Sequence, residues 1–493
     1  MSSTNNLKLL AIGLDAAEPL LIQQMIEAGL MPGIGELAAD GSWLRVEAPA
    51  YIGSGSVWPT FITGTSATEH GRYSEWIWRP GEMKLERYHG RDLDPFWKKL
   101  DNEGIAVGVL DVPFATPVGL KSGFEVAEWW AHDSVLENTQ SGPENIANLI
   151  RQVPAHPLSF KRQAAVKPTD VAAMRQLTTD STEGVRRRAR LAQHLIDHTD
   201  PTMALIVFPE THHAGHQLWH TIDSDHPIYR SQNLSFAEPL LQEVYREIDC
   251  QITNLASKTN GDTAVMVFSL HGMKPGLGSP AFLSGLLCEL GFSQLNGWRS
   301  QTWSERCWSL LGGLKKRSPQ FVRNAYYRRT PQVAIQKVAR PTMIPLYNWQ
   351  KTRAFSLPTD QYGWIRINLK GREVKGSVAL SDYSATRDEL EAMLRGLKDS
   401  DDRPLVREIV RTAADESQAQ QQHIPDLVVH WHDEAFAPRL RIANTNLECQ
   451  PVGIKTGQHA LDGFCLLKGG PKDLGTSILA QEMGSLITRM VVQ

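Results

Sequence analysis

The chain has 493 residues, with 51 basic side chains, 54 acidic side chains and a formal net charge of −3. This length is enough for one large α/β domain with insertions, or for two domains. The near balance of charge gives no global attraction to nucleic acid or to an anionic membrane. We therefore expect no duplex nucleic acid as a partner, and we expect any basic surface to be local.

The cysteines and the N-terminal segment indicate the compartment. The five cysteines are widely spaced and form no CxxC pair, so neither a disulfide framework nor a thiolate zinc site is indicated. The apolar run near the N-terminus, 9–14, is too short for a signal peptide or a membrane span. We expect a cytoplasmic protein without a transmembrane segment. The oligomeric state is left open.

Apolar runs rich in leucine, isoleucine and valine recur along the chain and are separated by helix-like stretches. The runs are LLAIGL (9–14), AVGVLDV (106–112), ALIVF (204–208), AVMVFSL (264–270) and LVVHW (427–431), and the helical candidates are 18–30, 183–198, 235–257 and 387–397. Unbroken apolar runs are typical of strands buried on both faces. The pattern predicts an α/β fold with a mostly parallel sheet flanked by helices.

Residues 296–345 differ from the rest of the chain. They carry ten lysines and arginines against one acid, Glu305, with tryptophans and tyrosines interleaved. One interpretation is an inserted helical segment with a solvated basic face. The other is an arm that contacts a polyanion or an anionic lipid.

Side chains that bind metals follow the ends of several predicted strands. Asp15 follows the first run, His212 and His216 follow ALIVF, His271 follows AVMVFSL, and His459 precedes another apolar stretch. Ligands collect beyond the carboxyl ends of strands in a parallel sheet, and imidazole suits zinc, iron or manganese better than magnesium. Alternatively, Asp15 caps a helix that begins near residue 18, and a single histidine is structural.

A nucleophile is available in the run GSGSVWPTFITG (53–64). Its small residues let the backbone turn tightly, and a hydroxyl there would precede an apolar helical run. The candidates are Ser54, Ser56 and Thr60, and the pattern alone does not choose among them. A capped loop without a catalytic role is the alternative.

The order of these motifs resembles the alkaline phosphatase superfamily, in particular its type I phosphodiesterase/nucleotide pyrophosphatase branch. The matching elements, spread from residue 9 to about 472, are Asp15 in GLDAAEP, Ser54 ten residues before Gly64, His70-Gly71, His212 to His216, Ser269-Leu270-His271-Gly272 and Gly457-Gln458-His459. The stretch 349–376 also resembles a segment found in these phosphohydrolases. The least-matched part is 296–345.

This resemblance implies the fold and a set of site residues. It implies an alkaline-phosphatase-like three-layer sandwich, with residues 1–493 forming a single catalytic domain and 296–345 a basic helical insertion. It implies that Ser54 is the nucleophile. One metal position would hold Asp15, Ser54 and His271, and the other would hold His212, His216 and His459. Asn368 and Arg372 would hold substrate, with a structural turn as the alternative.

The chain departs from the family pattern at two carboxylates. His212 and Leu270 stand where the pattern has aspartate. Losing two anionic ligands weakens a site for two divalent cations. Three outcomes are open: a nearby carboxylate replaces them, the substrate supplies the charge, or one metal binds tightly. The candidate replacements are Glu210, Asp223, Asp225, Asp262 and Asp462. Three histidines match a catalytic zinc site, so we expect zinc ahead of manganese or iron, with one or two ions bound.

We therefore expect a metal-dependent phosphohydrolase that acts on a small phosphoester, preferably a diester, through Ser54 and a phosphoseryl intermediate. Glu210 or His213 could serve as a general acid, or Glu210 could only support the metal ligands. Several aromatic residues could form a stacking wall for the leaving group, or they could belong to the core: Tyr73, Trp76, Trp78, Trp129 and Trp130.

Other functions remain open at this point. A phosphomonoesterase, a phosphonate or sulfate ester hydrolase, or a phospho-group transferase would use much the same residues. A member that has lost catalysis and only binds a metal or ligand is a further alternative, and Leu270 favours it.

Overall fold

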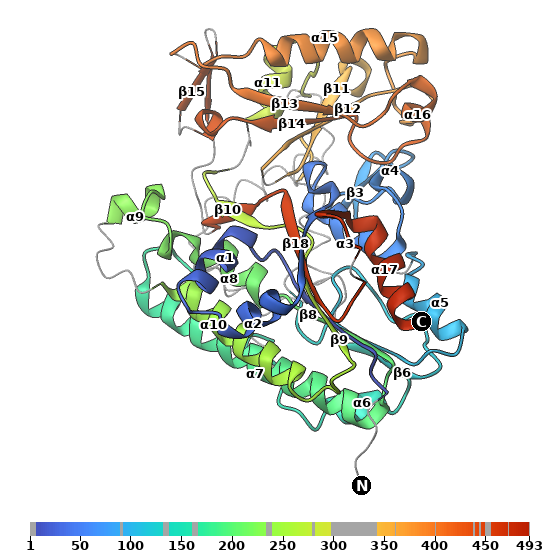
Figure 1. The fold of residues 1–493 in the computed structure, drawn as a ribbon. Helices are drawn as coiled ribbons and strands as arrows, with labels where there is room; N and C mark the ends of the chain where they lie inside the picture. The colour runs from blue at the N-terminus through green and yellow to red at the C-terminus, as the bar shows by residue number, and fades with distance from the viewer. Residues whose placement is uncertain are drawn as a thin grey trace. The chain divides into compact units, whose positions relative to one another are not determined.

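The structure is a computed structural model, and Figure 1 shows its fold. It describes residues 6–88, 92–131, 138–159, 166–232, 239–278, 282–296, 343–359, 361–399, 401–436, 439–442, 445–448, 455–471 and 473–492. Most of the predicted insertion at 296–345 lies outside these residues. Contacts divide the chain into two compact units. Unit 1 contains residues 1–70, 89–276 and 454–493, and unit 2 contains residues 71–88 and 277–453.

Unit 1 is built on a nine-stranded sheet. In spatial order its strands are β19 (Ser477–Leu479), β2 (Ser42–Glu47), β18 (Asp462–Lys468), β9 (Ala264–Ser269), β1 (Leu9–Leu14), β8 (Met203–Phe208), β5 (Val107–Leu110), β6 (Gly123–Ala127) and β7 (Gln140–Gly142). The five strands from β9 to β6 run parallel to one another, and antiparallel pairs lie toward the edges. The prediction of a mostly parallel central sheet is confirmed.

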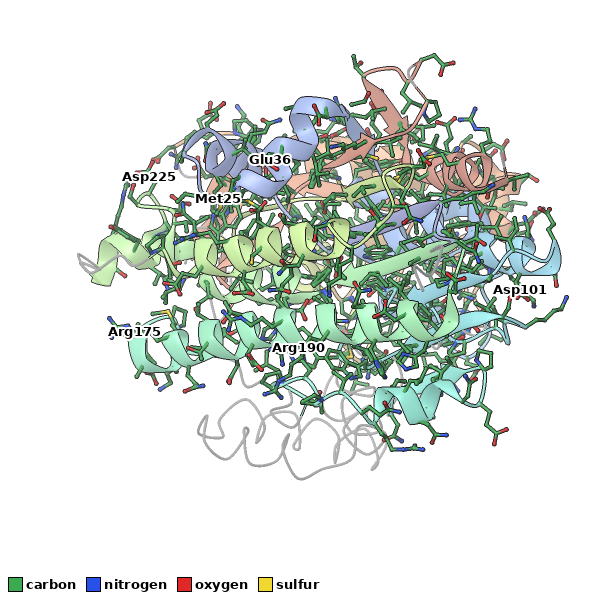
Figure 2. All side chains as sticks on the ribbon, turned by 60° about the horizontal axis from the view of Figure 1, so that its bottom comes forward. Met25, Glu36, Asp101, Arg175, Arg190 and Asp225 are labelled. Atoms are coloured by element: carbon green, nitrogen blue, oxygen red, sulfur yellow. The ribbon has the colours of Figure 1, made fainter. Side chains whose placement is uncertain are left out.

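Helices cover both faces of this sheet. One layer contains α1 (Pro19–Glu27), α2 (Pro32–Asp40), α7 (Val171–Thr199), α8 (Glu210–Leu218) and α10 (Leu240–Ala256). The other contains α3 (Val57–Thr63), α5 (Phe96–Asn102) and α17 (Ala480–Val492). In Figure 2 the first layer lies toward the viewer, with Arg175 and Arg190 marking the course of α7.

Side chains of β1 alternate between these two layers, as the period of a strand requires. Leu10, Ile12 and Leu14 join the core cluster that α1, α2, α7 and α10 complete. On the opposite face, a Cβ at Gly13 would lie 3.1 Å from the Trp58 ring of α3. The helix, sheet and helix layers form the predicted three-layer α/β sandwich.

Shorter elements complete the described part of unit 1. They are α4 (Ala67–His70), α6 (Ile146–Ile150), α9 (Pro227–Gln232), and the antiparallel pair β10 (Met273–Pro275) and β17 (Gly457–His459). Among the residues that the structure describes, no helix is both long and apolar enough to cross a membrane.

Unit 2 has a four-stranded antiparallel sheet of its own. Its spatial order is β11 (Ala354–Leu357), β12 (Gly363–Ile367), β14 (Leu427–Trp431) and β13 (Val406–Arg411). Around it lie α11 (Leu283–Glu289), α15 (Tyr383–Arg395) and α16 (Glu416–Gln421). Two further hairpins are β3 (Trp76–Arg79) with β4 (Lys84–Arg87), and β15 (Arg439–Ile442) with β16 (Thr445–Glu448).

The run LVVHW corrects one expectation. It forms β14, but β14 belongs to this antiparallel sheet and not to the parallel sheet predicted for it. All five residues of β14 are buried. The unbroken apolar run therefore predicted correctly that both faces of the strand are buried. Burial does not determine whether the neighbouring strands are parallel or antiparallel.

Candidate metal centre

The pairing of β1 with β8 places Asp15 beside the start of α8. Leu14 lies opposite Phe208, and the Asp15 amide donates to the Phe208 carbonyl at 3.1 Å. The Thr211 hydroxyl then donates to the Asp15 carbonyl at 2.6 Å. These hydrogen bonds link the ends of two neighbouring parallel strands to each other and to Thr211, the residue before His212.

His212 and His216 lie on a helix, which corrects the predicted strand-to-loop exit. The helix α8 begins at Glu210, one residue after Pro209 ends the strand. Residues four apart on a helix lie on the same face, one turn above the other. The two imidazoles therefore face the same side, with His213 directed elsewhere.

Two glycines let β17 approach α8 and bring His459 to the same place. A Cβ at Gly457 would lie 2.3 Å from the Gly215 carbonyl oxygen, so only glycine fits there. The Thr456 amide donates to the His216 carbonyl at 2.6 Å. His459 follows two residues after Gly457, on the same face of the short strand.

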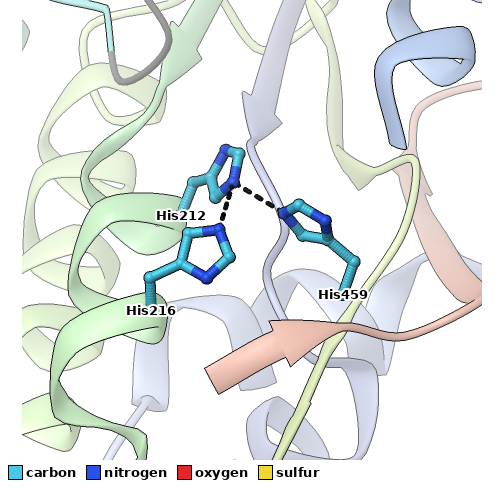
Figure 3. A group of neighbouring side chains, drawn as sticks. All are labelled: His212, His216 and His459. Atoms are coloured by element: carbon cyan, nitrogen blue, oxygen red, sulfur yellow. Dashed lines mark hydrogen bonds between the residues drawn. The ribbon is translucent and has the colours of Figure 1, made fainter. Parts of the chain in front are cut away.

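The three histidines converge on one point, as Figure 3 shows. Nε2 of His212 lies 3.0 Å from Nε2 of His216 and 2.8 Å from Nε2 of His459. Among the described residues, these three form the group whose ligand atoms all lie within 4.8 Å of one another. The predicted three-histidine set is therefore brought together.

The hydrogen bonds of the other ring nitrogens decide what the centre can hold. Nδ1 of His212 lies 2.7 Å from the Asp15 carboxylate, and Nδ1 of His216 lies 2.7 Å from the Gly457 carbonyl. Both oxygens only accept, so both Nδ1 atoms carry the hydrogen. In the neutral rings, each Nε2 then presents a lone pair to the other.

Two lone pairs facing each other at 3.0 Å repel, so this arrangement fits a cation placed between them. A tetrahedral zinc ion with Zn–N bonds of about 2.05 Å separates its nitrogen ligands by about 3.3 Å. Nε2 of His212 lies 3.0 Å from that of His216 and 2.8 Å from that of His459, both close to that value. The donor set fits a divalent ion of the zinc type.

The Asp15 carboxylate is buried, at 3% exposure, and both of its oxygens are hydrogen-bonded. Oδ2 accepts from His212 at 2.7 Å, and Oδ1 accepts from the Trp58 indole at 2.8 Å. Burial by itself would raise the pKa of Asp15, but the neighbouring His212 and His271 and the hydrogen bonds from His212 and Trp58 together lower it. The carboxylate is therefore ionised near neutral pH. Asp15 does not cap α1, because Glu18 occupies that position and accepts from the Leu20 amide.

His271 lies next to the triad. Its ring centroid is 4.8 Å from that of His459 and 6.1 Å from that of His212. Its Nδ1 lies 3.1 Å from the Gly272 carbonyl, and burial lowers its pKa, which keeps the ring neutral. Leu270, one residue earlier, is buried and supplies no ligand.

The structure separates the three hydroxyl candidates. Ser56 donates to the carbonyls of Pro49 and Gly53, at 2.8 and 2.6 Å, and Thr60 is paired with His70 at 2.9 Å. The hydroxyl of Ser54 makes no hydrogen bond with another described residue. Ser54 begins the 3₁₀ turn that leads into α3, one helical turn before Trp58.

Glu210 is not a replacement metal ligand. It is fully buried and pairs with Arg188 at 2.9 Å and with His156 at 3.2 Å. Burial would raise the pKa of Glu210, but Arg188 outweighs burial and lowers it. A carboxylate held ionised by a buried guanidinium is also a poor proton donor. The partners of Glu210 found among the described residues are Arg188 and His156 and not a histidine of the triad, so the predicted support of the metal ligands stays a prediction.

His213 is likewise unsuited to be a general acid. It is buried with its ring edge-on to Trp130, at 5.5 Å between centroids. Burial lowers the pKa of His213 to about 3, so the ring is neutral at ordinary pH. It packs in the core next to the centre instead of contributing to it.

The other proposed replacement carboxylates are surface groups. Asp462 pairs with Arg45 at 3.0 Å with 65% of its side chain exposed, and Asp225 pairs with Arg230. Figure 2 shows Asp225 at the edge of unit 1. Asp223 accepts from the Asp225 amide, and Asp262 is exposed. None of them belongs to the convergent group found among the described residues.

The predicted substrate residues lie in unit 2 and serve its framework. The Asn368 amide donates to the carbonyls of Trp349, Thr352 and Lys375. Arg372 is buried and pairs with Glu373 and Asp426. The structural turn named as the alternative fits both residues.

The predicted aromatic wall is divided between the two units. In unit 2, Trp76 is half-buried in β3, and the buried Tyr73 and Trp78 pack on other aromatic rings of the same unit. In unit 1, Trp129 lies against Arg188 and Trp130 stacks on His156. These contacts are those of core residues.

Trp58 is the site residue that the sequence analysis missed. Its signal was present, because it stands four residues after Ser54 in a run that becomes helical. Tryptophan in such a run is usually read as core, and nothing in the sequence links its indole to Asp15.

A family model described as type I phosphodiesterase/nucleotide pyrophosphatase matches residues 9–453. No curated protein sequence matches the chain. Among solved structures, phosphonoacetate hydrolase from Sinorhizobium meliloti 1021 in complex with phosphonoformate has a TM-score of 0.54 at 12% identity, covering 99% of this chain and 96% of that chain. Its complex with phosphonoacetate has a TM-score of 0.52 at the same identity and coverage. Human ectonucleotide pyrophosphatase/phosphodiesterase 5 has a TM-score of 0.47 at 11% identity, covering 98% of this chain and 95% of that chain.

Proposed function

Because the chain belongs to the type I phosphodiesterase/nucleotide pyrophosphatase family of phosphoester hydrolases, we propose that it is a metal-dependent phosphodiesterase with Ser54 as its nucleophile. The observation that carries the metal dependence is the convergence of three imidazoles, with Nε2 of His212 lying 3.0 Å from that of His216 and 2.8 Å from that of His459. The substrate class is a small phosphoester.

His212, His216 and His459 would hold the ion. Zinc is the proposed metal because it takes three imidazoles and keeps a fourth position open, and manganese or iron would also suit nitrogen ligands. When bound, such an ion would neutralise charge on the phosphoryl oxygens and lower the pKa of a hydroxyl in contact with it.

The role proposed for Ser54 rests on the hydrogen bonding of the three candidate hydroxyls. Among the described residues, Ser56 and Thr60 have hydroxyls that are held by carbonyls or by a histidine, whereas no such bond is found for the hydroxyl of Ser54. In the proposed reaction its oxygen forms a bond to phosphorus as the bond to the leaving oxygen breaks. Water then cleaves the phosphoseryl intermediate and restores the hydroxyl.

The remaining residues orient the centre. Asp15 holds the His212 ring, and Trp58, one helical turn after Ser54, holds Asp15. This chain of contacts supports placing Ser54 at the same edge of the sheet as the histidines. A separate general acid is not assigned, since Glu210 and His213 are both committed to buried packing.

The test compares hydrolysis of bis-nitrophenyl phosphate by wild type, Ser54→Ala and Ser56→Ala, together with metal analysis of each. We expect Ser54→Ala to lose turnover while retaining the ion. Ser56→Ala is the matched control, because its hydroxyl only braces the turn, and it should keep most turnover. Equal turnover in wild type and Ser54→Ala would remove the nucleophile assignment.

Assays with other substrates distinguish the alternative functions from a phosphodiesterase. Nitrophenyl phosphate tests for a monoesterase, and phosphonoacetate and a sulfate ester test the phosphonate and sulfate alternatives. Transfer of phosphate to an added alcohol would indicate a transferase. Metal binding without turnover of any of these substrates would favour the degenerate, binding-only member suggested by Leu270.

The proposal also includes a reducing, cytoplasmic location. It is supported by Cys250, Cys288 and Cys465, which are all free thiols in the structure.

A further inference from the structure

The second metal position expected from the family would consist of Asp15, Ser54, His271 and an aspartate at position 270. The residue at 270 is leucine, buried at 1% exposure. Leucine has no ligand atom, and a buried apolar side chain excludes the water that could fill a vacant coordination place. The expected position therefore has at most three ligands, of which one carries charge.

Asp15 is committed to other partners. The Trp58 indole donates to Oδ1 at 2.8 Å, and the His212 imidazole donates to Oδ2 at 2.7 Å. Both donors present hydrogens to the carboxylate, on both of its oxygens. A cation approaching either oxygen would meet a donor hydrogen already bound there, and binding would require one of these bonds to lengthen or break.

The contact with His212 gives Asp15 a different role. A carboxylate that accepts from Nδ1–H fixes the tautomer and turns the Nε2 lone pair toward the ion. In His212 that lone pair points to the nitrogens of His216 and His459. The family aspartate at position 212 is thus replaced by a histidine that takes Asp15 as its support.

Charge supports the same conclusion. Asp15 is the ionised carboxylate in contact with the triad, whereas Glu210 is neutralised by Arg188. Two divalent ions would bring four positive charges to this buried place, whereas Asp15 is the one carboxylate found in contact with the triad in the described part of the chain. One divalent ion brings two, which Asp15 and an anionic substrate balance.

We propose that Asp15 is a positioning residue for His212 and not a metal ligand, and that the chain holds one divalent cation, bound by His212, His216 and His459. This inference rests on the proposed function, since it assumes that the histidine triad binds a metal. It goes further by assigning the stoichiometry and by removing Asp15 and His271 from the ligand set.

The experiment measures bound zinc per chain by elemental analysis after reconstitution of the full-length protein and removal of free metal. A background with His194→Gln and His198→Gln is used throughout. These two histidines lie four residues apart on α7 with ring centroids 4.2 Å apart, and they could bind an ion on the surface. We expect one zinc per chain.

Three variants test the roles. His271→Ala should keep one zinc. Asp15→Asn keeps an oxygen that can accept from His212, so it should keep one zinc with affinity weakened by about 10- to 100-fold, as loss of a supporting carboxylate does elsewhere. His216→Ala should lose the ion. Cobalt substitution gives a second measurement, because tetrahedral cobalt absorbs strongly and should do so equally in wild type and His271→Ala.

Two zinc ions per wild-type chain, with one lost in His271→Ala or Asp15→Asn, would overturn this inference and leave the proposed function intact. No zinc in wild type, with turnover unaffected by chelation, would overturn the proposed metal dependence and the inference with it.

Discussion

The indole Nε1 of Trp58 donates a 2.8 Å hydrogen bond to Oδ1 of Asp15, within the buried layer between α3 and β1. Trp58 also packs on Phe61 and Phe268, so its ring belongs to the core while its one polar atom holds Asp15 beside the three histidines. One side chain therefore contributes both to the core and to the proposed metal site.

Trp58→Phe keeps an aromatic ring but leaves one oxygen of a buried carboxylate without its donor. We expect the free energy of unfolding of the metal-free protein to fall by about 1–3 kcal/mol, measured by urea denaturation. Trp43→Phe is the control, because Trp43 stacks on Phe464 in the same sheet and no hydrogen bond to its indole is found among the described residues. An equal loss in both variants would mean that the bond to Asp15 contributes nothing.

Gly457→Ala should separate β17 from α8. The added Cβ would lie 2.3 Å from the Gly215 carbonyl, which is backbone and cannot rotate away. We expect a loss of zinc affinity of at least about tenfold, because a shift near 1 Å at His459 breaks the triad. Isothermal titration with zinc measures it. Gly261→Ala, where a Cβ meets nothing within 4 Å, should bind like wild type.

Arg188→Met should be among the most destabilising changes in α7. Arg188 is fully buried and pairs with Asp111 at 2.5 Å and Glu210 at 2.9 Å. Removing it leaves two carboxylates buried without their cation, at a cost of about 3–5 kcal/mol in thermal or urea unfolding. Arg186→Met, two residues away in a half-exposed pair with Glu247, should cost less than about 1 kcal/mol. Similar losses in the two variants would contradict the buried pairing.

Asp426 should give unit 2 an acid-sensitive component of stability. Burial would raise the pKa of Asp426, but Arg372 outweighs burial and lowers it below 3.8. A carboxyl group with a depressed pKa in the folded state stabilises above its unfolded pKa, and that stability is lost as pH falls through the folded pKa.

Asp426→Asn should therefore be less stable than wild type at pH 7, by about 3–5 kcal/mol. The difference should shrink as pH falls below 3.8 and through the lower pKa that Asp426 has in the folded protein. Urea denaturation at pH 7 and at a series of pH values below 3.8 measures it, with Asp388→Asn, an exposed partner of Arg411, as the control. A difference that stays constant with pH would show that the charge on Asp426 is not involved.

Thiol chemistry should distinguish two cysteines. Cys250 is exposed, whereas burial raises the pKa of Cys465 to about 12 in the middle of β18. Because the thiolate is the reactive form, iodoacetamide at pH 8 should label Cys250 quickly and Cys465 only after unfolding. Peptide mapping by mass spectrometry reads both sites in one sample. Early labelling of Cys465 would mean that β18 opens in the native state.

The sequence predicted the strands of the central sheet well, because residues buried on both faces form unbroken apolar runs. The run at 9–14 coincides with β1. The residue type and position of three histidines also predicted that they would come together in one site. The direction of β14 was missed because pairing depends on partners distant in the chain, and burial alone does not encode them.

What the sequence could not supply was the partner of each polar atom. The division of roles among Ser54, Ser56 and Thr60 depends on carbonyls and a histidine that the fold brings close. The tie between Trp58 and Asp15 spans 43 residues and has no local signal. The bounds of the two units could not be predicted from the sequence either, because unit 2 is composed of two segments that are far apart in sequence.

The contact between His459 and His212 joins positions 247 residues apart. An ion shared by these side chains would act as a reversible crosslink, closing a loop that contains residues 277–453 of unit 2. An ion that binds the folded state alone adds stability that grows with the logarithm of its free concentration, once that concentration exceeds the dissociation constant. The melting temperature of the protein should therefore rise with free zinc, so that the lifetime of the folded protein would depend on metal supply.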